Sequence, residues 1–257
     1  MNYETLLVDK DKRGVVSLTL NRPEKRNALS AKMIDELTNF AASLTSDIRV
    51  TVIQGAGNLF CAGGDLEWMN AQIKADRSTR VAEARKLAFM LKALNELPVP
   101  LIAKVHGAAY GGGVGLACVC DYVISRPNVK FGFTETRLGL IPSTIGPYVV
   151  GKMGQAKARE VFMSGNIFNE LDAKKLNIVS EISDDLDQSV EEHIIPYLKT
   201  APKAVGEAKA LVRSLGATID DKVIEQTIQQ LADIWEGEEA RHGIEAFLKK
   251  TKPRWSN

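Results

Sequence analysis

The chain has 257 residues, of which 45% are hydrophobic and 25% charged, and its formal net charge is +1. It is long enough to bury a sizeable core, as one large domain or two small ones. The balanced charge gives no reason to expect nucleic acid or an anionic membrane as the main partner. The longest apolar region, residues 99–124, is rich in glycine and interrupted by Lys104, His106 and Asp121, which argues against a membrane span.

The cysteines and histidines point to neither a disulfide framework nor a metal site. Cys61, Cys118 and Cys120 are an odd number in apolar surroundings, which predicts buried, reduced thiols. The three histidines are scattered, so no metal site is expected. The first residues are charged and contain no signal-peptide core, so we expect a cytoplasmic protein.

In the first 133 residues, short apolar runs alternate with segments in which apolar residues recur at helical spacing. The runs predict strands over residues 4–9, 14–20, 50–53, 101–105, 122–125 and 129–133. Helices are predicted after Ser30, after Asp65, over residues 78–95 and after the glycines at 111–113, with Ser30 and Asp65 as N-terminal caps. This alternation is typical of an α/β protein.

The remainder of the chain, from Gln155 onward, has a mostly helical pattern. Helices are predicted over residues 156–165, 170–176, 189–198, 202–215, 220–236 and 238–250, with a short strand over 177–182. In the last two helices apolar residues recur every three or four positions, and such a stripe has to be covered by the same subunit or by a neighbour. No linker marks a domain boundary within the first 200 residues.

Three adjacent glycines, Gly111 to Gly113, follow the apolar run 101–105 and predict a turn from strand into helix. Without a Cβ the backbone can approach a ligand closely. The start of a helix also presents unpaired N–H groups, which suit a carbonyl oxygen that becomes negative during a reaction. Taken alone, such a cluster is more typical of a simple turn or a tight packing point, and it matches neither the dinucleotide fingerprint nor the P-loop.

Three further segments accompany the glycines: NRPEKRNALS at 21–30, GNLFCAGGDLEWM at 57–69 and FGFTETRLGLIP at 131–142. In this order and spacing the four motifs resemble the crotonase superfamily of enoyl-CoA hydratases and isomerases, over essentially the whole chain. The resemblance implies an α/β fold with a crotonase-like spiral of ββα units over residues 1–200. It also implies a C-terminal helical region over 201–257 that takes part in trimerisation, giving a homotrimer or a dimer of trimers.

The resemblance also implies the site residues. The backbone N–H groups of Gly64 and Gly112 would hold the thioester oxygen of an acyl-CoA substrate, and Glu135 would handle protons. Coenzyme A is part of the substrate, so no separate cofactor is expected. Positions that match the adenine and pantetheine path are Ala28, Ala62, Asp65 and Leu66, and the cations placed for the phosphates are Lys25 and Arg26, or Lys249, Lys250 and Lys252.

Glu135 lies between aromatic and aliphatic residues, and an apolar site can raise a carboxyl pKa towards neutrality. A salt bridge to Arg137 is the alternative role. The better-known hydratases carry a second glutamate two residues after the third glycine, where this chain has Gly115. Glu135 therefore has to make both proton transfers, or share them with another group or with the substrate.

One hypothesis is that a distal carboxylate of the substrate helps to position the water. Arg137 and Ser143 are candidate contacts for it, although each also fits a structural role. Within the superfamily the chain looks most like the methylglutaconyl-CoA hydratase branch of leucine breakdown. Two segments carry this likeness, VGL after the glycines and ETRLGLIPSTIGPYVV. Trp68 and Tyr110 are candidates to line the acyl pocket or the core, and His106 is typical of a core histidine.

The leading interpretation is an enoyl-CoA hydratase that adds water reversibly across the 2,3 double bond of a thioester, including branched or carboxylated acyl chains. A Δ3,Δ2-enoyl-CoA isomerase is the second interpretation, because one carboxylate suffices to move a proton between carbons. A third is a non-catalytic acyl-CoA-binding subunit, inactive because the second glutamate is replaced by Gly115.

Overall fold

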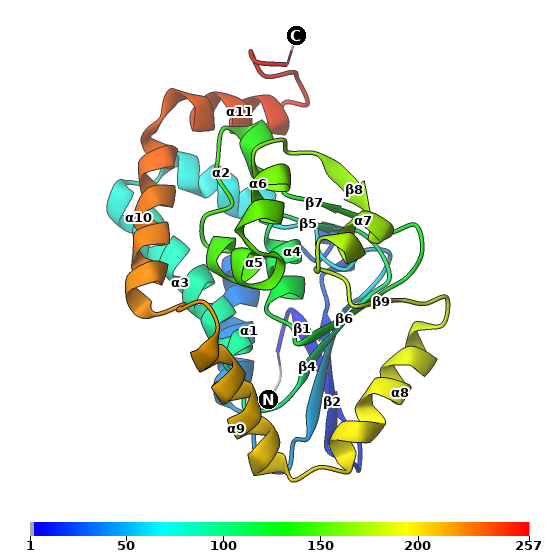
Figure 1. Cartoon of the computed structure of the whole chain (residues 1–257). Helices are drawn as coiled ribbons and strands as arrows, with labels where there is room; N and C mark the ends of the chain where they lie inside the picture. The colour runs from blue at the N-terminus through cyan, green and yellow to red at the C-terminus, as the bar shows by residue number, and fades with distance from the viewer. Residues whose placement is uncertain (1–2, 257) are drawn as a thin grey trace.

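The structure, a computed structural model, describes residues 3–256 and is built on a six-stranded sheet of order β1-β2-β3-β4-β6-β9 (Figure 1). Its strands are β1 (Leu6–Lys10), β2 (Val15–Leu20), β3 (Val50–Gly55), β4 (Leu101–Val105), β6 (Tyr122–Ser125) and β9 (Glu181–Ile182). The predicted hairpin is confirmed, because β1 pairs antiparallel with β2. The other pairings are parallel, as helical crossovers between successive strands require.

A second sheet has three short strands in the order β5-β7-β8, namely β5 (Ala109–Tyr110), β7 (Lys130–Gly132) and β8 (Ile167–Asn169). Thus β6 and β7, which follow each other in the chain, belong to different sheets. The chain leaves the large sheet after β4, forms β5 and turns directly into the helix that starts at Gly112. The small sheet therefore supports the glycine turn.

The helices that carry the site follow the predicted order, with α5 as an addition. They are α1 (Ala31–Ala42), α2 (Leu66–Lys74), α3 (Arg77–Asn95), α4 (Gly112–Cys118) and α5 (Gly146–Met153), with the 3-10 turns η1 (Pro23–Lys25) and η2 (Glu135–Leu138). Ser30 caps α1, as predicted, by accepting a hydrogen bond from the N–H of Met33 at 3.2 Å. Helix α5 was not expected, because Gly146 and Pro147 resemble a break, yet a proline in the first turn is compatible with a helix.

The rest of the chain forms α6 (Gln155–Phe162), α7 (Glu170–Lys175), α8 (Leu186–Leu198), α9 (Pro202–Leu215), α10 (Asp221–Glu236) and α11 (Glu238–Leu248). Within residues 3–256 no helix is both long and apolar enough to cross a membrane. The three cysteines are free and buried, as predicted, and burial raises the pKa of each thiol to about 12.

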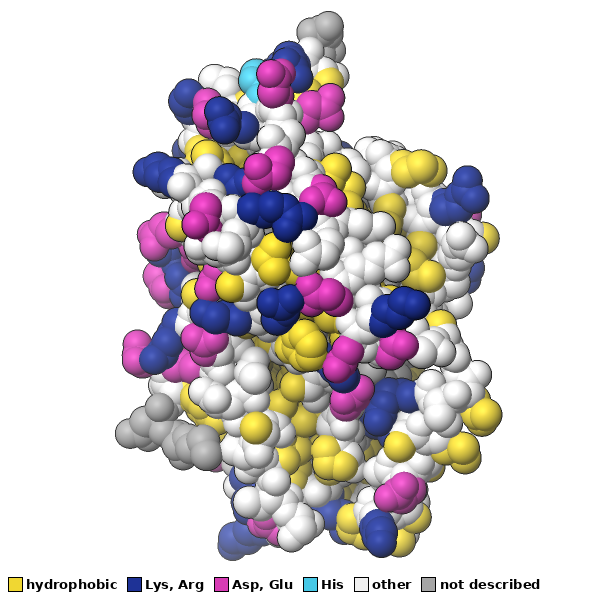
Figure 2. Space-filling model, turned by 90° about the vertical axis from the view of Figure 1, so that its left-hand side faces the viewer, with side chains coloured by type: hydrophobic (Ala, Val, Ile, Leu, Met, Phe, Trp, Pro, Cys, Tyr) yellow, Lys and Arg dark blue, Asp and Glu magenta, His cyan; other side chains and the backbone are white. Residues whose placement is uncertain are grey.

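Helices α9 and α10 differ in whether other parts of the chain cover their apolar residues. Helix α10 packs along α3 of the same chain, with buried Ile224, Ile228 and Trp235, so this apolar stripe is covered within the subunit (Figure 1). Helix α9 buries no residue, and it exposes 70% of Val212 and 79% of Leu215. Figure 2, which views the side of α9 and α10, shows hydrophobic side chains mainly below the middle of this face.

Candidate active site

The first half of the site is a backbone loop at Gly63 and Gly64. The N–H of Leu29 donates to the carbonyl of Gly63 at 2.7 Å, and the N–H of Asp65 donates to the carbonyl of Leu29 at 3.1 Å. Gly64 lies opposite Leu29 in this bridge. Because successive N–H groups of an extended segment point to opposite sides, that of Gly64 points away from Leu29, and it has no hydrogen-bond partner within residues 3–256.

Gly112 brings a second backbone donor next to this loop. It is the first residue of α4, so its N–H has no partner inside the helix, and none elsewhere in the described chain. A Cβ built on Gly63 would lie 3.6 Å from the nitrogen of Gly112. The two glycine segments are therefore in contact and together present the unpaired N–H groups of Gly64 and Gly112.

A buried ion pair fixes the end of this loop. Asp65, which is 3% exposed, accepts the N–H groups of Glu67 and Trp68 and caps α2, as predicted. Its other oxygen lies 2.8 Å from the guanidinium of Arg22, which also donates to the carbonyl of Ala28. Burial opposes ionisation of Asp65, but these hydrogen bonds and the Arg22 charge lower its pKa below the usual value.

Glu135 begins the η2 turn and lies against the glycine turn from the other side. A Cβ on Gly111 would lie 2.9 Å from Oε1 of Glu135, so a side chain at position 111 would force this carboxylate to shift. Gly111 also has a φ of +48°, which favours glycine, and its N–H donates to Gly132 in β7. The small sheet and the glycine turn thus position the carboxylate.

Glu135 is half-buried, and one oxygen of its carboxylate is buried and unpaired. This oxygen, Oε2, has no hydrogen-bond partner in the described part of the chain. Burial raises the pKa of Glu135 to about 7, against an opposing contribution from its own backbone N–H. The alternative of a salt bridge to Arg137 is wrong, since Arg137 is exposed and packs over Gly165 instead.

The position of the missing second glutamate is filled by a hydrocarbon side chain. Gly115 lies one turn after Gly111 in α4 and donates its N–H to the carbonyl of Gly111 at 3.1 Å. A Cβ on Gly115 would lie only 2.4 Å from Cγ2 of Ile145, which is 2% exposed. The start of α4 therefore meets the carboxylate of Glu135 at its N-cap and Ile145 one turn later.

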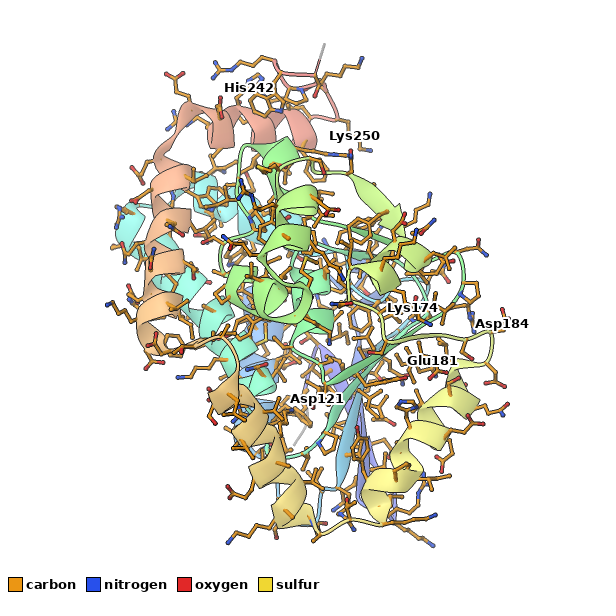
Figure 3. The ribbon with its side chains drawn as sticks, viewed as in Figure 1. Asp121, Lys174, Glu181, Asp184, His242 and Lys250 are labelled. Carbon is orange, nitrogen blue, oxygen red and sulfur yellow. The ribbon has the colours of Figure 1, made fainter. Side chains whose placement is uncertain are left out.

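The residues expected along the CoA path lie around the Gly64 loop. Ala28 is buried, Ala62 is half-buried and donates its N–H to Arg26, and Leu66 is 49% exposed although apolar. Lys25 forms an exposed ion pair with Glu67 at 2.7 Å. The tail lysines follow α11, which packs against η2 and α2, and Figure 3 shows Lys250 and His242 at this end of the molecule.

Other candidates from the sequence have structural partners. The indole N–H of Trp68 donates to Glu83 at 3.1 Å, and His106 contacts the carbonyl of Gly57 at 2.8 Å. The hydroxyl of Ser143 donates to the carbonyl of Thr227. Ser143 also lines a mainly apolar cavity of about 440 Å³ beside η2 and α5.

The matched family model is that of the enoyl-CoA hydratases and isomerases, and the match covers residues 10–257. The chain belongs to this family. A probable enoyl-CoA hydratase of Mycobacterium tuberculosis is 31% identical over the full length of both chains. The 2,3-dehydroadipyl-CoA hydratase of Escherichia coli is 32% identical, over 96% of this chain and 97% of its own length.

Solved structures of the family confirm the predicted α/β fold. An enoyl-CoA hydratase from Shewanella pealeana, 33% identical, matches 99% of this chain and 97% of its own, with a TM-score of 0.82. One from Mycobacterium avium, 28% identical, matches both chains completely, with a TM-score of 0.87. The predicted spiral with a C-terminal helical region is therefore confirmed, whereas the methylglutaconyl branch remains a prediction.

Sequence reasoning did not assign a role to three residues of this family site. Gly111 was seen only as part of a glycine cluster, although its contact with Glu135 gives it a specific function. Arg22 stands in the NRP motif, which was a usable signal for its pairing with Asp65. Ile145 carried no signal, because its contact with Gly115 depends on how α5 packs on α4.

Proposed function

We propose that the protein is an enzyme, an enoyl-CoA hydratase that adds water across the 2,3 double bond of an acyl-CoA thioester. The observation that carries this proposal is the buried carboxylate of Glu135, placed against a glycine turn next to two unpaired backbone N–H groups. The names of several relatives support the same activity.

In the proposed reaction the thioester oxygen accepts hydrogen bonds from Gly64 and Gly112. The ionised Glu135 takes a proton from water while the water oxygen bonds to C3, and the π electrons move to give an enolate on the thioester oxygen. Protonated Glu135 then gives the proton to C2 as the enolate electrons form the new C–H bond. One water molecule is added, and the carboxylate is restored.

The environment of Glu135 suits both steps. A group with a pKa near the working pH acts with similar ease as base and as acid, and burial raises the pKa of Glu135 to about 7. Two preorganised donors stabilise the developing charge, and loss of one such donor costs about 3 kcal/mol in transition-state stabilisation.

The proposed substrate carries a second carboxylate on its acyl chain, as in methylglutaconyl-CoA of leucine breakdown. Two observations support this choice. Gly115 and Ile145 supply no second protein carboxylate, so a polar group of the substrate would help to orient the water. One relative is named 2,3-dehydroadipyl-CoA hydratase, after an acyl-CoA of a dicarboxylic acid.

The enoyl-CoA isomerase is the second candidate, and the same contact favours it. With Ile145 against Gly115, Glu135 alone can take a proton from C2 of a 3-enoyl-CoA and return it to C4, which moves the double bond to C2–C3 without adding water. The product then has the mass of the substrate, whereas hydration adds one water.

The decisive experiment is turnover of the purified protein with crotonyl-CoA, 3-methylglutaconyl-CoA and a 3-enoyl-CoA, with products identified by mass. The hydratase is supported if the first two gain water, with the carboxylated substrate faster, and if Glu135→Gln abolishes the gain. It is contradicted if only the 3-enoyl-CoA is converted, without a change of mass. Binding without any turnover would instead indicate a non-catalytic acyl-CoA-binding protein.

We place the CoA moiety along Ala28, Ala62, Asp65 and Leu66, with Lys25 near the phosphates. The exposed Leu66 next to the Gly64 loop supports this path, because its apolar surface has no protein cover. Asp65 would act through the backbone, since Arg22 and the start of α2 already occupy its oxygens.

We further propose that α9 contacts a second copy of the chain in a homotrimer or a dimer of trimers. Its exposed apolar residues support this assembly. The double variant Val212→Glu/Leu215→Glu should sediment as a monomer, while Lys203→Glu on the same helix should leave the wild-type trimer or hexamer intact. Monomeric wild type at micromolar concentration would contradict the assembly.

A further inference from the structure

Position 115 lies one turn along α4 from Gly111, the residue that Glu135 contacts. Gly111 is the N-cap of α4, and its carbonyl accepts the N–H of Gly115 at 3.1 Å. The carboxylate of Glu135 lies over Gly111, with Oε1 2.9 Å from where a Cβ would stand. A side chain at position 115 would therefore start about one helical turn from the residue that this carboxylate contacts.

Ile145 occupies the volume that such a side chain needs. A Cβ at position 115 would lie 2.4 Å from Cγ2 and 2.9 Å from Cβ of Ile145. Nonbonded carbons normally stay about 3.5 to 4.0 Å apart. Rotation about the Ile145 side-chain bonds moves Cγ2 but not Cβ, so a rotamer change cannot relieve the contact.

We propose that Ile145 determines how many acid–base groups this site can carry, because its side chain excludes a carboxylate at position 115 and leaves the proton transfers to Glu135. Ile145 is then a specificity-determining residue: it touches no proton, yet it decides whether water can be held by a second protein group. The catalytic meaning of this inference rests on the proposed hydration, whereas the exclusion itself rests on geometry.

The matched double variant Gly115→Glu/Ile145→Gly would place a second carboxylate in the neighbourhood of Glu135. Two carboxylates so close titrate as a coupled pair, and one ionisation moves to higher pH. In hydration, the ionised member would take the proton of water as its oxygen bonds to C3. The protonated member would give its proton to C2, and exchange with solvent would then restore both.

The first test is a 13C NMR titration of the Glu135 carboxyl, assigned by its loss in Glu135→Gln, so that no turnover is needed. Ile145→Gly alone should lower the titration midpoint of Glu135, because solvent replaces hydrocarbon. Adding Gly115→Glu to that variant should raise the midpoint by about one pH unit and produce two steps. An unchanged midpoint between these two folded variants would overturn the inference.

A stability measurement covers the case in which the double variant does not fold. Gly115→Ala should lower the Tm of the wild type by about 5 °C or more, because its methyl group overlaps Ile145. In the Ile145→Gly background the same change should raise the Tm, since alanine favours a helix. Equal effects in both backgrounds would show that Ile145 does not exclude a side chain at position 115.

The pH dependence of kcat separates this inference from the proposed function. With crotonyl-CoA, the wild type should show one ionisation and the double variant two. If the wild type converts no enoyl-CoA, the proposed function fails, while the titration and the Tm measurements still decide the inference. If the wild type is active and the folded double variant keeps a single ionisation, the inference fails alone.

Discussion

The two halves of the site are fixed by different means. The Gly64 loop is joined to its neighbours by backbone hydrogen bonds at Leu29 and by the buried pair of Asp65 and Arg22. Glu135 is placed by packing against Gly111, and its Oε2 has no hydrogen-bond partner within residues 3–256. The Gly64 loop is thus held by hydrogen bonds and an ion pair that leave the site's two N–H groups free, whereas Oε2 of Glu135 is buried without a partner.

This difference shows that substitutions of side chains can change the chemistry of the Glu135 half more readily than that of the Gly64 loop. Backbone N–H groups persist when side chains change, provided that the loop keeps its position. A proton carrier is a side chain whose pKa depends on its surroundings, so Glu135, Gly115 and Ile145 can alter the chemistry without altering the fold.

The largest effect is expected for Asp65→Ala, which removes the cap of α2 and leaves Arg22 buried without its partner. Breaking such a pair costs about 3 to 5 kcal/mol in the free energy of unfolding. The exposed cap Asp76, which accepts the N–H of Thr79, provides the control. Asp76→Ala should cost about 1 kcal/mol, and urea unfolding that gave equal losses would contradict a special role for the Arg22 pair.

Glu135→Gln should change the pH dependence of stability. The pKa of Glu135 is about 7 in the folded protein and 4.5 as the reference, so the folded state binds more protons, and the wild type loses stability as pH rises from about 4.5 to above 7. Relative to wild type, the glutamine variant should gain up to about 3 kcal/mol over this range. A constant difference between the two unfolding curves would argue against a buried, destabilised carboxylate.

Glu36→Gln provides a control of opposite sign. Burial opposes ionisation of Glu36, but hydrogen bonds from Glu4 and Thr5 lower its pKa below 4.5. The wild-type carboxylate therefore contributes stability at neutral pH that is lost as the pH falls below about 4.5. The penalty of this variant should shrink in acid.

Gly111→Ala perturbs the contact between the halves. The new methyl group would displace the Glu135 carboxylate, and a misplacement of about 1 Å costs about a hundredfold in kcat. Gly154→Ala is the matched control, because Gly154 has a φ of +82° and nothing lies within 4 Å of where its Cβ would stand. It should lower the Tm through backbone strain without changing kcat; equal kcat losses in both variants would point to strain alone.

The sequence predicted the fold closely because the local signals agreed with the tertiary structure. The hairpin, the caps Ser30 and Asp65, and the strand at 101–105 all lie where expected. The strands β5 and β8 were missed because two or three residues show no periodicity. Helix α5 was missed because its first residues are those of a typical break.

The site was predictable only where a motif or an unusual residue marked it. Glu135 was conspicuous as an acid among apolar residues, and its burial agrees with that expectation. Gly64 and Gly112 act through backbone atoms, so their selection needed the family resemblance. The contact of Ile145 with Gly115 was invisible, because residues 30 positions apart meet only through the packing of α5 on α4.

The most direct test of the account is the pH dependence of hydration under single-turnover conditions, for wild type and Glu135→Gln, between pH 5 and 9. If Glu135 moves the protons, the wild-type rate should rise through one ionisation near pH 7 as Glu135 becomes a base. The variant should be slower by about a thousandfold and independent of pH. A variant that kept the ionisation near pH 7 and most of its rate would show that another group moves the protons.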